Sequence, residues 1–281
     1  MRRSKVIRVR IGSICLWLAG VLASGVVAVL FGLGERGPQF WVALSAMPLF
    51  YTLAWWLKGR GGVYVEMYAP VALDNQQAQR LYAKHGLIVL VGLYRPHQGS
   101  RAQGLSPQQH LDYARRCDYQ PLDLPKSTLG TAIAAVKAHS TRLEHCWFVT
   151  TTSLGNQPSA LDFIPVLEKY LKDQVSSKCQ YHYGPNYAIT FRENDLSVSE
   201  MTRSLVNGIF DEARKEHQIG SLEIVCDYTS CPRSMALGMI LACLAKDRDV
   251  QFVGARYDDQ GRPVGDLFPI LYRFSPVVEK E

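Results

Sequence analysis

Two stretches near the N-terminus, residues 11–33 and 40–57, contain no charged side chain. A helix that crosses the hydrocarbon core of a bilayer needs roughly 17 to 25 mostly apolar residues, and both stretches fall in that range. The link between them, residues 34–39, carries only one acid and one base. The lack of charge also argues against a proton relay within one hairpin. We therefore expect residues 1–60 to form a transmembrane helical hairpin.

The charges that flank the apolar stretches set the expected orientation. Basic side chains precede the first stretch and follow the second: Arg2, Arg3, Lys5, Arg8, Arg10, Lys58 and Arg60. The positive-inside rule then places both termini in the cytoplasm and the chain in the inner membrane as a multi-pass protein. A cleaved signal peptide fits poorly, because its apolar region is shorter and no second span follows it.

Cysteine pairs and metal-ligand spacings are also lacking. The seven cysteines show no C-x-x-C spacing, and an odd count without such spacing suits a reducing cytoplasm. The histidines show no recognisable ligand pattern, among them His97, His110, His139, His145 and His182. We expect no metal site and no resident cofactor.

The chain has neither G-x-G-x-x-G nor G-x-x-x-x-G-K-[ST], which disfavours NAD and ATP as ligands. It shows no Ser-His-Asp order and no paired carboxylates, so a separate catalytic domain is not expected. The net charge of +6 is concentrated at the N-terminus, where anionic lipid would attract it. Direct binding to DNA or RNA duplexes is therefore not expected.

Beyond residue 60, strand-like and helix-like segments alternate. Residues 86–93 form a continuous apolar run, typical of a parallel strand that is buried on both faces. The expected strands are 63–68, 86–93, 146–151, 221–227, 250–253 and 267–274, with 178–191 extended. The expected helices are 75–85, 128–143, 159–174, 197–217 and 232–244. This alternation predicts an α/β fold with a Rossmann-like, mainly parallel sheet and helices on both faces.

Three segments make up the expected domain organisation. The hairpin of residues 1–60 is followed by a connector, 61–85, and by one ligand-sensing domain, 86–281. Within that domain, residues 97–109 are polar and are expected to form a loop, and residues 258–261 are expected to turn an antiparallel hairpin.

Ligands of an open parallel sheet bind at the carboxyl ends of its strands, near helix N-termini. Three such ends supply hydroxyls, amides or guanidinium groups here, at residues 92–96, 150–156 and 227–238. The candidate ligand-binding residues are Tyr94, Arg95, Thr152, Ser153, Thr229, Ser230, Arg233 and Ser234. Arg233 leads this set, because a ligand phosphate could pair with it beside a helix N-terminus. For Thr229 and Ser230, a helix N-cap is the competing role.

The third strand end resembles a segment of the CARF (CRISPR-associated Rossmann fold) family. In that family, a buried strand ends in Asp and leads through a Thr/Ser turn to a basic residue and an Ala/Gly-rich helix. Four residues match in type and order: Asp227, Thr229, Arg233 and Met235. The resemblance covers roughly residues 86–275, although residues 230–232 replace the family's glycine-rich turn, and Pro232 donates no amide. Asp227 is expected to shape its loop and Met235 to lie in the core.

The resemblance implies a homodimer or a higher even-numbered oligomer that binds cyclic oligoadenylate, as the tetra- or hexa-adenylate, across a two-fold axis. With the predicted hairpin, it implies a membrane effector of type III CRISPR antiviral defence. Such an effector would permeabilise or depolarise the bilayer when it binds the messenger. Three alternatives stay open. The first is a two-span SAVED-like sensor of another cyclic-nucleotide system, and the second is a tethered ring nuclease that cleaves its ligand with help from Thr152, Ser153 and Arg233. The third is a membrane-tethered α/β protein of unrelated metabolic role.

Overall fold

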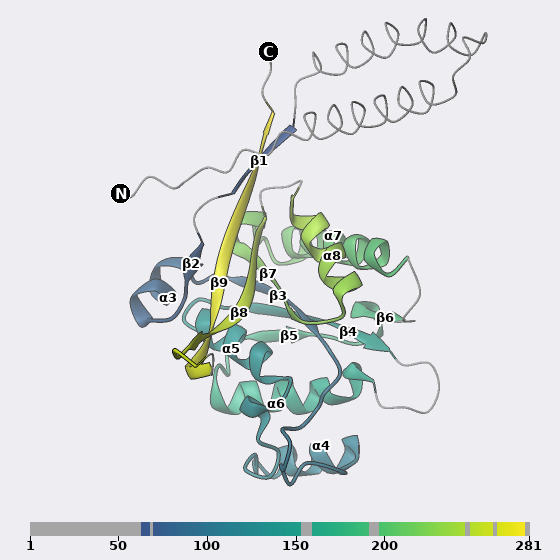
Figure 1. Ribbon diagram of the computed structural model, residues 1–281. Coiled ribbons are helices and arrows are strands. Elements are labelled where there is room, and N and C mark those ends of the chain that lie inside the picture. Colours follow the sequence, from purple (N-terminus) through teal and green to yellow (C-terminus); the bar gives the residue numbers. More distant parts are fainter. Residues whose placement is uncertain are drawn as a thin grey trace, which may run out of the picture. The chain divides into compact units, whose positions relative to one another are not determined.

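The computed structural model describes residues 63–67, 70–152, 159–190, 197–244, 248–260 and 263–278 (Figure 1). The chain divides into two compact units, Tyr68–Phe274 and a smaller one that combines Met1–Met67 with Ser275–Glu281. The predicted spans, 11–33 and 40–57, lie outside the described residues. Of the helices that are described, none combines the length and the apolar character needed to cross a membrane.

A mixed sheet forms the centre of the larger unit. Its strand order from β9 is β9-β8-β7-β3-β4-β5, with β2 paired to β9 and β6 paired to β4. Every described pairing among β3, β4, β5, β6, β7 and β8 is parallel, and β9 runs antiparallel to β8. The strands are β1 (Val63–Met67, in the smaller unit), β2 (Val71–Ala72), β3 (Gly86–Val91), β4 (His145–Thr152), β5 (Gln180–His182), β6 (Ala188–Thr190), β7 (Ile224–Ser230), β8 (Asp249–Tyr257) and β9 (Pro263–Val278).

Helices cover both faces of this sheet, as a doubly wound α/β fold requires. One hydrophobic core packs α4, α5 and α6 against one face, and a second packs α7 and α8 against the other (Figure 1). The helices are α3 (Gln76–Tyr82), α4 (Pro107–Arg115), α5 (Gly130–His139), α6 (Ile164–Gln174), α7 (Val198–Glu216) and α8 (Arg233–Leu244). Single 3-10 turns lie at Leu124–Lys126, Ala160–Phe163, Pro185–Tyr187 and Ser221–Glu223.

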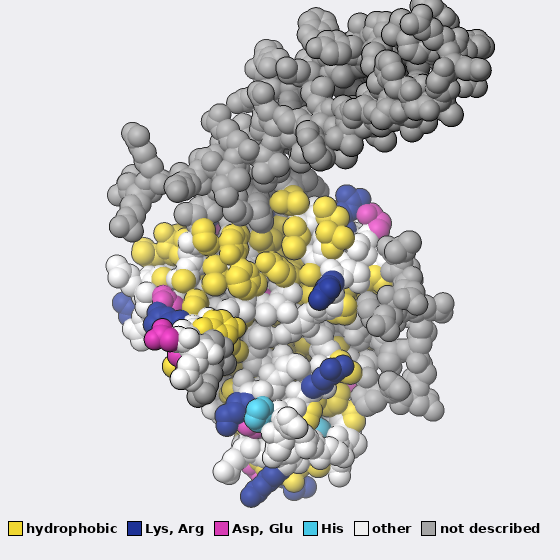
Figure 2. Space-filling view, viewed as in Figure 1, with side chains coloured by type: hydrophobic (Ala, Val, Ile, Leu, Met, Phe, Trp, Pro, Cys, Tyr) yellow, Lys and Arg dark blue, Asp and Glu magenta, His cyan; other side chains and the backbone are white. Residues whose placement is uncertain are grey.

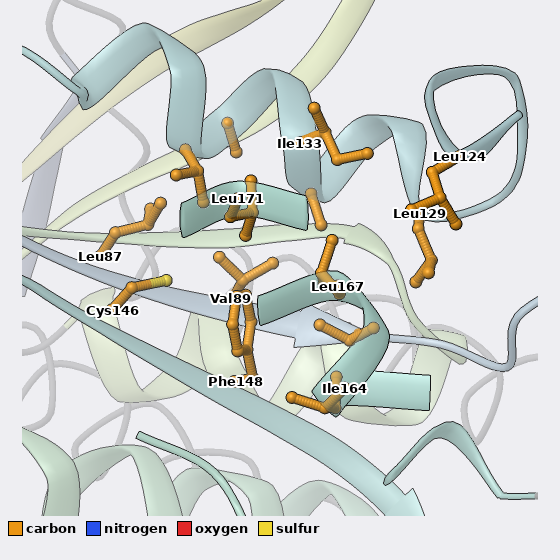
Figure 3. Packing of buried hydrophobic residues seen from close by; sticks show 14 of the residues in the cluster. Leu87, Val89, Leu124, Leu129, Ile133, Cys146, Phe148, Ile164, Leu167 and Leu171 are labelled. Carbon is orange, nitrogen blue, oxygen red and sulfur yellow. The ribbon is translucent and has the colours of Figure 1, made fainter. Parts of the chain in front are cut away.

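The central strand β3 explains why its sequence is uniformly apolar. Every residue of β3 is buried. Leu87 and Val89 point to the first core, whereas Ile88 points to the second, so the alternation of a strand feeds both layers. Figure 3 shows Val89 and Phe148 among apolar side chains of α5 and α6, among them Ile133, Ile164 and Leu167. The predicted parallel sheet with helices on both faces is therefore confirmed.

The short helix α4 was not expected, because residues 97–109 read as a polar loop. Helix α4 begins with a capping box: Ser106 Oγ accepts from the Gln109 amide, and Gln109 Oε1 accepts from the Ser106 amide. The helix buries only His110 and Ala114. Two buried positions in nine residues are too few to produce a clear helical periodicity.

Candidate ligand-binding site at the carboxyl ends of β3 and β7

The sheet reverses its winding between β3 and β7. From β3 the chain crosses through α5 to β4 on one side, and β7 lies on the other side of β3. The connections that leave these two strands therefore diverge, and we refer to the region outside the carboxyl ends of β3 and β7 as the crevice. In doubly wound sheets, this switch point is where ligands bind.

The two strand ends approach each other closely at Gly92. A β carbon at that position would lie 2.2 Å from the carbonyl oxygen of Ser230, so only glycine fits without movement of the backbone. The register shifts just before this point: Val89 pairs with Asp227, but Val91 pairs with Ser230. Strand β7 thus has one residue more than β3 here, which is a β-bulge.

This bulge aims Ser230 at the start of α5. Asp227 is bonded on the α5 side of the sheet, and strict alternation would turn Ser230, three residues later, to the opposite side. Instead, Ser230 Oγ donates to the carbonyl oxygen of Thr128 at 3.3 Å and contacts Thr131 Oγ1. The hydroxyl at the end of β7 therefore meets a hydroxyl from the first turn of α5.

Thr128 holds the segment that follows β3. Its Oγ1 donates to the carbonyl oxygen of Leu93 at 3.0 Å and accepts from the amide of Arg95 at 2.8 Å. The Thr128 amide in turn donates to the carbonyl oxygen of Arg95 at 3.1 Å. These bonds fix the backbone of Arg95, while its side chain remains exposed to solvent.

Two helices begin beside the crevice. Helix α5 starts at Gly130, where a β carbon would lie 2.1 Å from the carbonyl oxygen of Pro125, and α8 starts at Arg233. Arg233 is exposed, and the Ser234 carbonyl oxygen accepts from Ser199 Oγ at 2.8 Å. Helix N-termini carry partial positive charge, so two of them beside Arg95 and Arg233 favour an anionic ligand.

Asp227 and Thr229 support the crevice from within the sheet. Asp227 Oδ1 accepts from the Thr229 amide at 2.9 Å, which is the loop-shaping role expected for it. Burial raises the pKa of Asp227 to about 6, against hydrogen bonds from Thr229 and Gln251 that lower it. Thr229 Oγ1 accepts from the Val253 amide at 2.7 Å, so this hydroxyl joins β7 to β8.

A buried row of polar groups runs from Asp227 across the sheet. Gln251 Nε2 donates to Asp227 Oδ2 at 3.0 Å, and Gln251 Oε1 lies 2.8 Å from His139 Nε2. His139 Nδ1 accepts from the Lys84 amide at 3.1 Å, so Nε2 must carry the proton that Gln251 accepts. Burial lowers the pKa of His139 to about 4, outweighing its hydrogen bond with Gln251. Every hydrogen bond in the row is therefore donated from the Lys84 side toward Asp227.

The remaining predicted residues have hydrogen-bond partners other than the crevice residues, are buried in the core, or lie outside the described residues. Tyr94 is only 6% exposed, and its hydroxyl donates to the carbonyl oxygen of Leu122. Thr152 ends β4, and its hydroxyl donates to Thr190 Oγ1 at 3.2 Å. Ser153 falls outside the described residues. Met235 is fully buried in the second core, as expected.

Sequence reasoning missed Gly92, Thr128 and Thr131 as parts of the site. Thr128 stands at the start of an expected helix, where Thr is a common N-cap residue. Nothing else in its local sequence points to a role in the site. The contacts of Thr128 and Thr131 with the ends of β3 and β7 span 33 to 102 residues of sequence. Such long-range pairings follow from the sheet order and have no local pattern.

Together these features define a doubly wound α/β protein with polar side chains at its switch point. No protein-family model matches the chain, and no curated protein matches it. Among solved structures, the chain is similar to Enterococcus italicus Csm6 bound to cyclic hexa-2'-fluoro-hexa-dAMP, with 12% identity and a TM-score of 0.35. The match covers 65% of this chain and 36% of that one, so this chain spans about a third of its length. A likeness at this TM-score establishes neither a shared fold nor a shared function.

Proposed function

We propose that the crevice between β3 and β7 binds a cyclic oligoadenylate, as the tetra- or hexa-adenylate. The observation that carries the proposal is that Arg95, Arg233, two helix N-termini and the adjoining hydroxyls of Thr131 and Ser230 all follow the carboxyl ends of β3 and β7. Phosphates suit the guanidinium groups and helix ends, and hydroxyls suit ribose and adenine edges. The resemblance of the segment around Asp227 and Arg233 to the CARF family adds independent support.

A homodimer would give the site the symmetry of a ring-shaped ligand. Helix α8 supports this arrangement, because Arg233, Leu237 and Leu241 recur every fourth residue and share one face of the helix. Leu237 is 51% exposed and Leu241 is 44% exposed. Figure 2 shows apolar side chains gathered over the part of the surface where α8 and the β8–β9 pair lie. Two copies joined along this face would bring their Arg233 side chains to one ligand.

The predicted hairpin of residues 1–60 supplies the response in this proposal. Ligand binding would close the paired domains and move the connector, 61–85, so that the apolar stretches repack and the inner membrane leaks or depolarises. The buried polar row supports such coupling, because it joins the Asp227 loop to Lys84 within that connector. The protein is thus proposed to be a multi-pass membrane effector of type III CRISPR defence, with both termini in the cytoplasm.

Ligand binding can be tested by calorimetry on the full-length protein in detergent. The panel would contain cyclic tri-, tetra- and hexa-adenylate, linear tetra-adenylate and cyclic dinucleotides. We expect tight binding of one cyclic oligoadenylate, a large loss for Arg233→Ala, and no change for Arg214→Ala, an exposed arginine of α7. Failure to bind every cyclic oligoadenylate would refute the proposal, and binding of another cyclic nucleotide instead would favour the SAVED-like alternative.

The response can be tested with the same protein in dye-loaded liposomes. We expect dye release or loss of membrane potential only when the ligand is present, and not in Arg233→Ala. Chromatography of the recovered ligand would show whether it has been cleaved, which is the outcome that favours a ring nuclease. A full-length chain that remains in the supernatant after membranes are sedimented would overturn the membrane part of the proposal.

A further inference from the structure

Three histidines meet at the edge of the sheet opposite the ligand crevice. His145 begins β4, His182 ends β5, and His217 caps the C-terminus of α7. One ring nitrogen from each lies within 4.8 Å of the others. His145 Nδ1 and His182 Nε2 are 3.0 Å apart, and the rings of His145 and His217 have centroids 4.1 Å apart.

This spacing is close to that of a metal site. Bonds of about 2.0 to 2.1 Å from a tetrahedral Zn²⁺ place its nitrogen ligands roughly 3.4 Å from one another. The His145–His182 pair already lies near that separation, and a ring nitrogen of His217 lies within 4.8 Å of both. Imidazole nitrogen is a preferred ligand of divalent zinc, copper, cobalt and nickel.

Neighbouring side chains hold the rings in place. Trp147 stacks on His182, with centroids 4.9 Å apart and planes 14° apart, and on His145 at 5.7 Å. Trp147 Nε1 donates to Glu212 Oε1 at 2.8 Å, and the Tyr187 hydroxyl donates to the same carboxylate at 2.9 Å. This shell fixes the carboxylate of Glu212 beside the rings, as outer contacts do around metal ligands.

The electrostatics also favour a cation. The C-terminus of α7 carries partial negative charge, and Glu212 adds a full one. Three close imidazole rings beside this negative charge therefore form a suitable environment for a cation.

We propose that His145, His182 and His217 bind one divalent transition-metal cation of the Zn²⁺ class. Three protein ligands leave a fourth position for water. Metal bound here joins β4, β5 and the end of α7, and the site does not depend on the ligand proposed for the crevice. Sequence spacing gave no sign of it, because the three residues come from three separate elements.

The test uses full-length protein purified in detergent without a polyhistidine tag. After treatment with a chelator, the protein is dialysed against Zn²⁺, washed, and analysed for metal by emission spectroscopy. We expect about one Zn²⁺ per chain. Co²⁺ in place of Zn²⁺ should give the intense visible absorption of a four-coordinate ion. His217→Ala should lose both signals, whereas His97→Ala, which removes an exposed loop histidine, should keep them.

Thermal melting separates metal binding from folding. Zn²⁺ should raise the melting temperature of the wild type and of His97→Ala, and it should leave His217→Ala unchanged. His182→Gln serves as a second variant should His217→Ala fail to fold. Equal Zn²⁺ retention by wild type and the folded variants, or no retention by the wild type, would overturn the site without touching the proposal for the crevice.

Discussion

The carbonyl oxygen of Ser230 lies only 2.2 Å from the position that a β carbon of residue 92 would take, and that residue is glycine. This contact brings the ends of β3 and β7 together, and it places the Ser230 hydroxyl against the start of α5. A side chain at residue 92 must therefore displace backbone, and the crevice would widen at its narrowest point.

Gly92→Ala should destabilise the protein by about 1 to 3 kcal/mol, the usual cost of overpacking. Gly208 is the matched control, because no atom lies within 4 Å of its β-carbon position in the middle of α7. Gly208→Ala should stabilise the protein by about 0.5 to 1 kcal/mol. Chemical unfolding followed by circular dichroism measures both effects. A Gly92→Ala protein as stable as the wild type would show that the two strand ends are not in contact.

The raised pKa of Asp227 makes one contribution to stability depend on pH. The folded value of about 6 lies above the ordinary 3.8, so the folded state binds more protons between these values. The stability that Asp227 contributes is therefore fully present below pH 4 and is lost as pH rises through about 6. Each unit of pKa shift corresponds to roughly 1.4 kcal/mol. The loss therefore amounts to something on the order of 3 kcal/mol.

Asp227→Asn removes that dependence. We expect the unfolding free energy of the variant to rise relative to that of the wild type between pH 4 and pH 6. Hydrogen bonds that the variant lacks add an offset to this difference that does not change with pH. His139 has a lowered pKa, and its contribution is instead lost as pH falls through about 4. Both proteins keep His139, so it cancels in the difference. A difference that stays constant with pH would contradict the shifted pKa of Asp227.

A second buried carboxylate, Asp249, is held by two cations. Lys84 Nζ lies 2.5 Å from its Oδ2, and Arg273 forms two bonds of 2.8 Å to it. Its side chain is fully buried. Asp249→Asn leaves the charge of Lys84 without compensation and should cost about 3 to 5 kcal/mol. Asp211→Asn breaks an exposed ion pair with Arg214 and should cost less than about 1 kcal/mol. Equal stability costs for the two substitutions would show that Asp249 is not a buried, paired carboxylate.

The two arginines of the crevice predict a salt-dependent affinity for the cyclic ligand. Arg95→Ala and Arg233→Ala should each weaken binding by roughly tenfold or more, since hydrogen bonds to charged groups contribute about 1.5 to 3 kcal/mol. Because each substitution removes one positive charge, the affinity of each variant should also fall less steeply with added salt than that of the wild type. Titrations at two salt concentrations measure this decrease. Unchanged affinity in both variants would remove the arginines from the site.

The exposed apolar face of α8 predicts the oligomeric state. Leu241→Glu should convert a dimer to a monomer in sedimentation experiments on the detergent-solubilised protein, because a buried charge opposes packing. Leu81→Glu is the control, since Leu81 is 65% exposed on α3. A dimer that survives Leu241→Glu would place the contact between copies elsewhere.

The features of the fold that the sequence predicted are those with a local pattern. The uniformly apolar β3 indicated a parallel strand, and residues 197–217 were expected to form the helix that is α7. The turn before β9 indicated an antiparallel hairpin, which β8 and β9 form. Helix α4 lacked such a pattern, because its contacts with the core are few.

The candidate site could be predicted only as a region. The carboxyl ends of β3 and β7 were expected to bind ligand, and the sheet order brings these two ends together. The β-bulge that turns Ser230 toward Thr128 depends on the register of two strands 138 residues apart, as in the pairing of Gly86 with Ile224. The histidine cluster depends likewise on how β4, β5 and α7 are arranged, which no local spacing encodes.

The buried row from Lys84 to Asp227 has a polarity, since each donor points toward the carboxylate. A proton that settles on Oδ2 of Asp227 and faces Gln251 can be accepted only if that amide turns over. The reversed amide then points its hydrogens at the protonated Nε2 of His139. If His139 moves its proton to Nδ1 in response, that nitrogen can no longer accept from the Lys84 amide. Protonation of one buried carboxylate would thus change hydrogen bonds as far away as the backbone of Lys84.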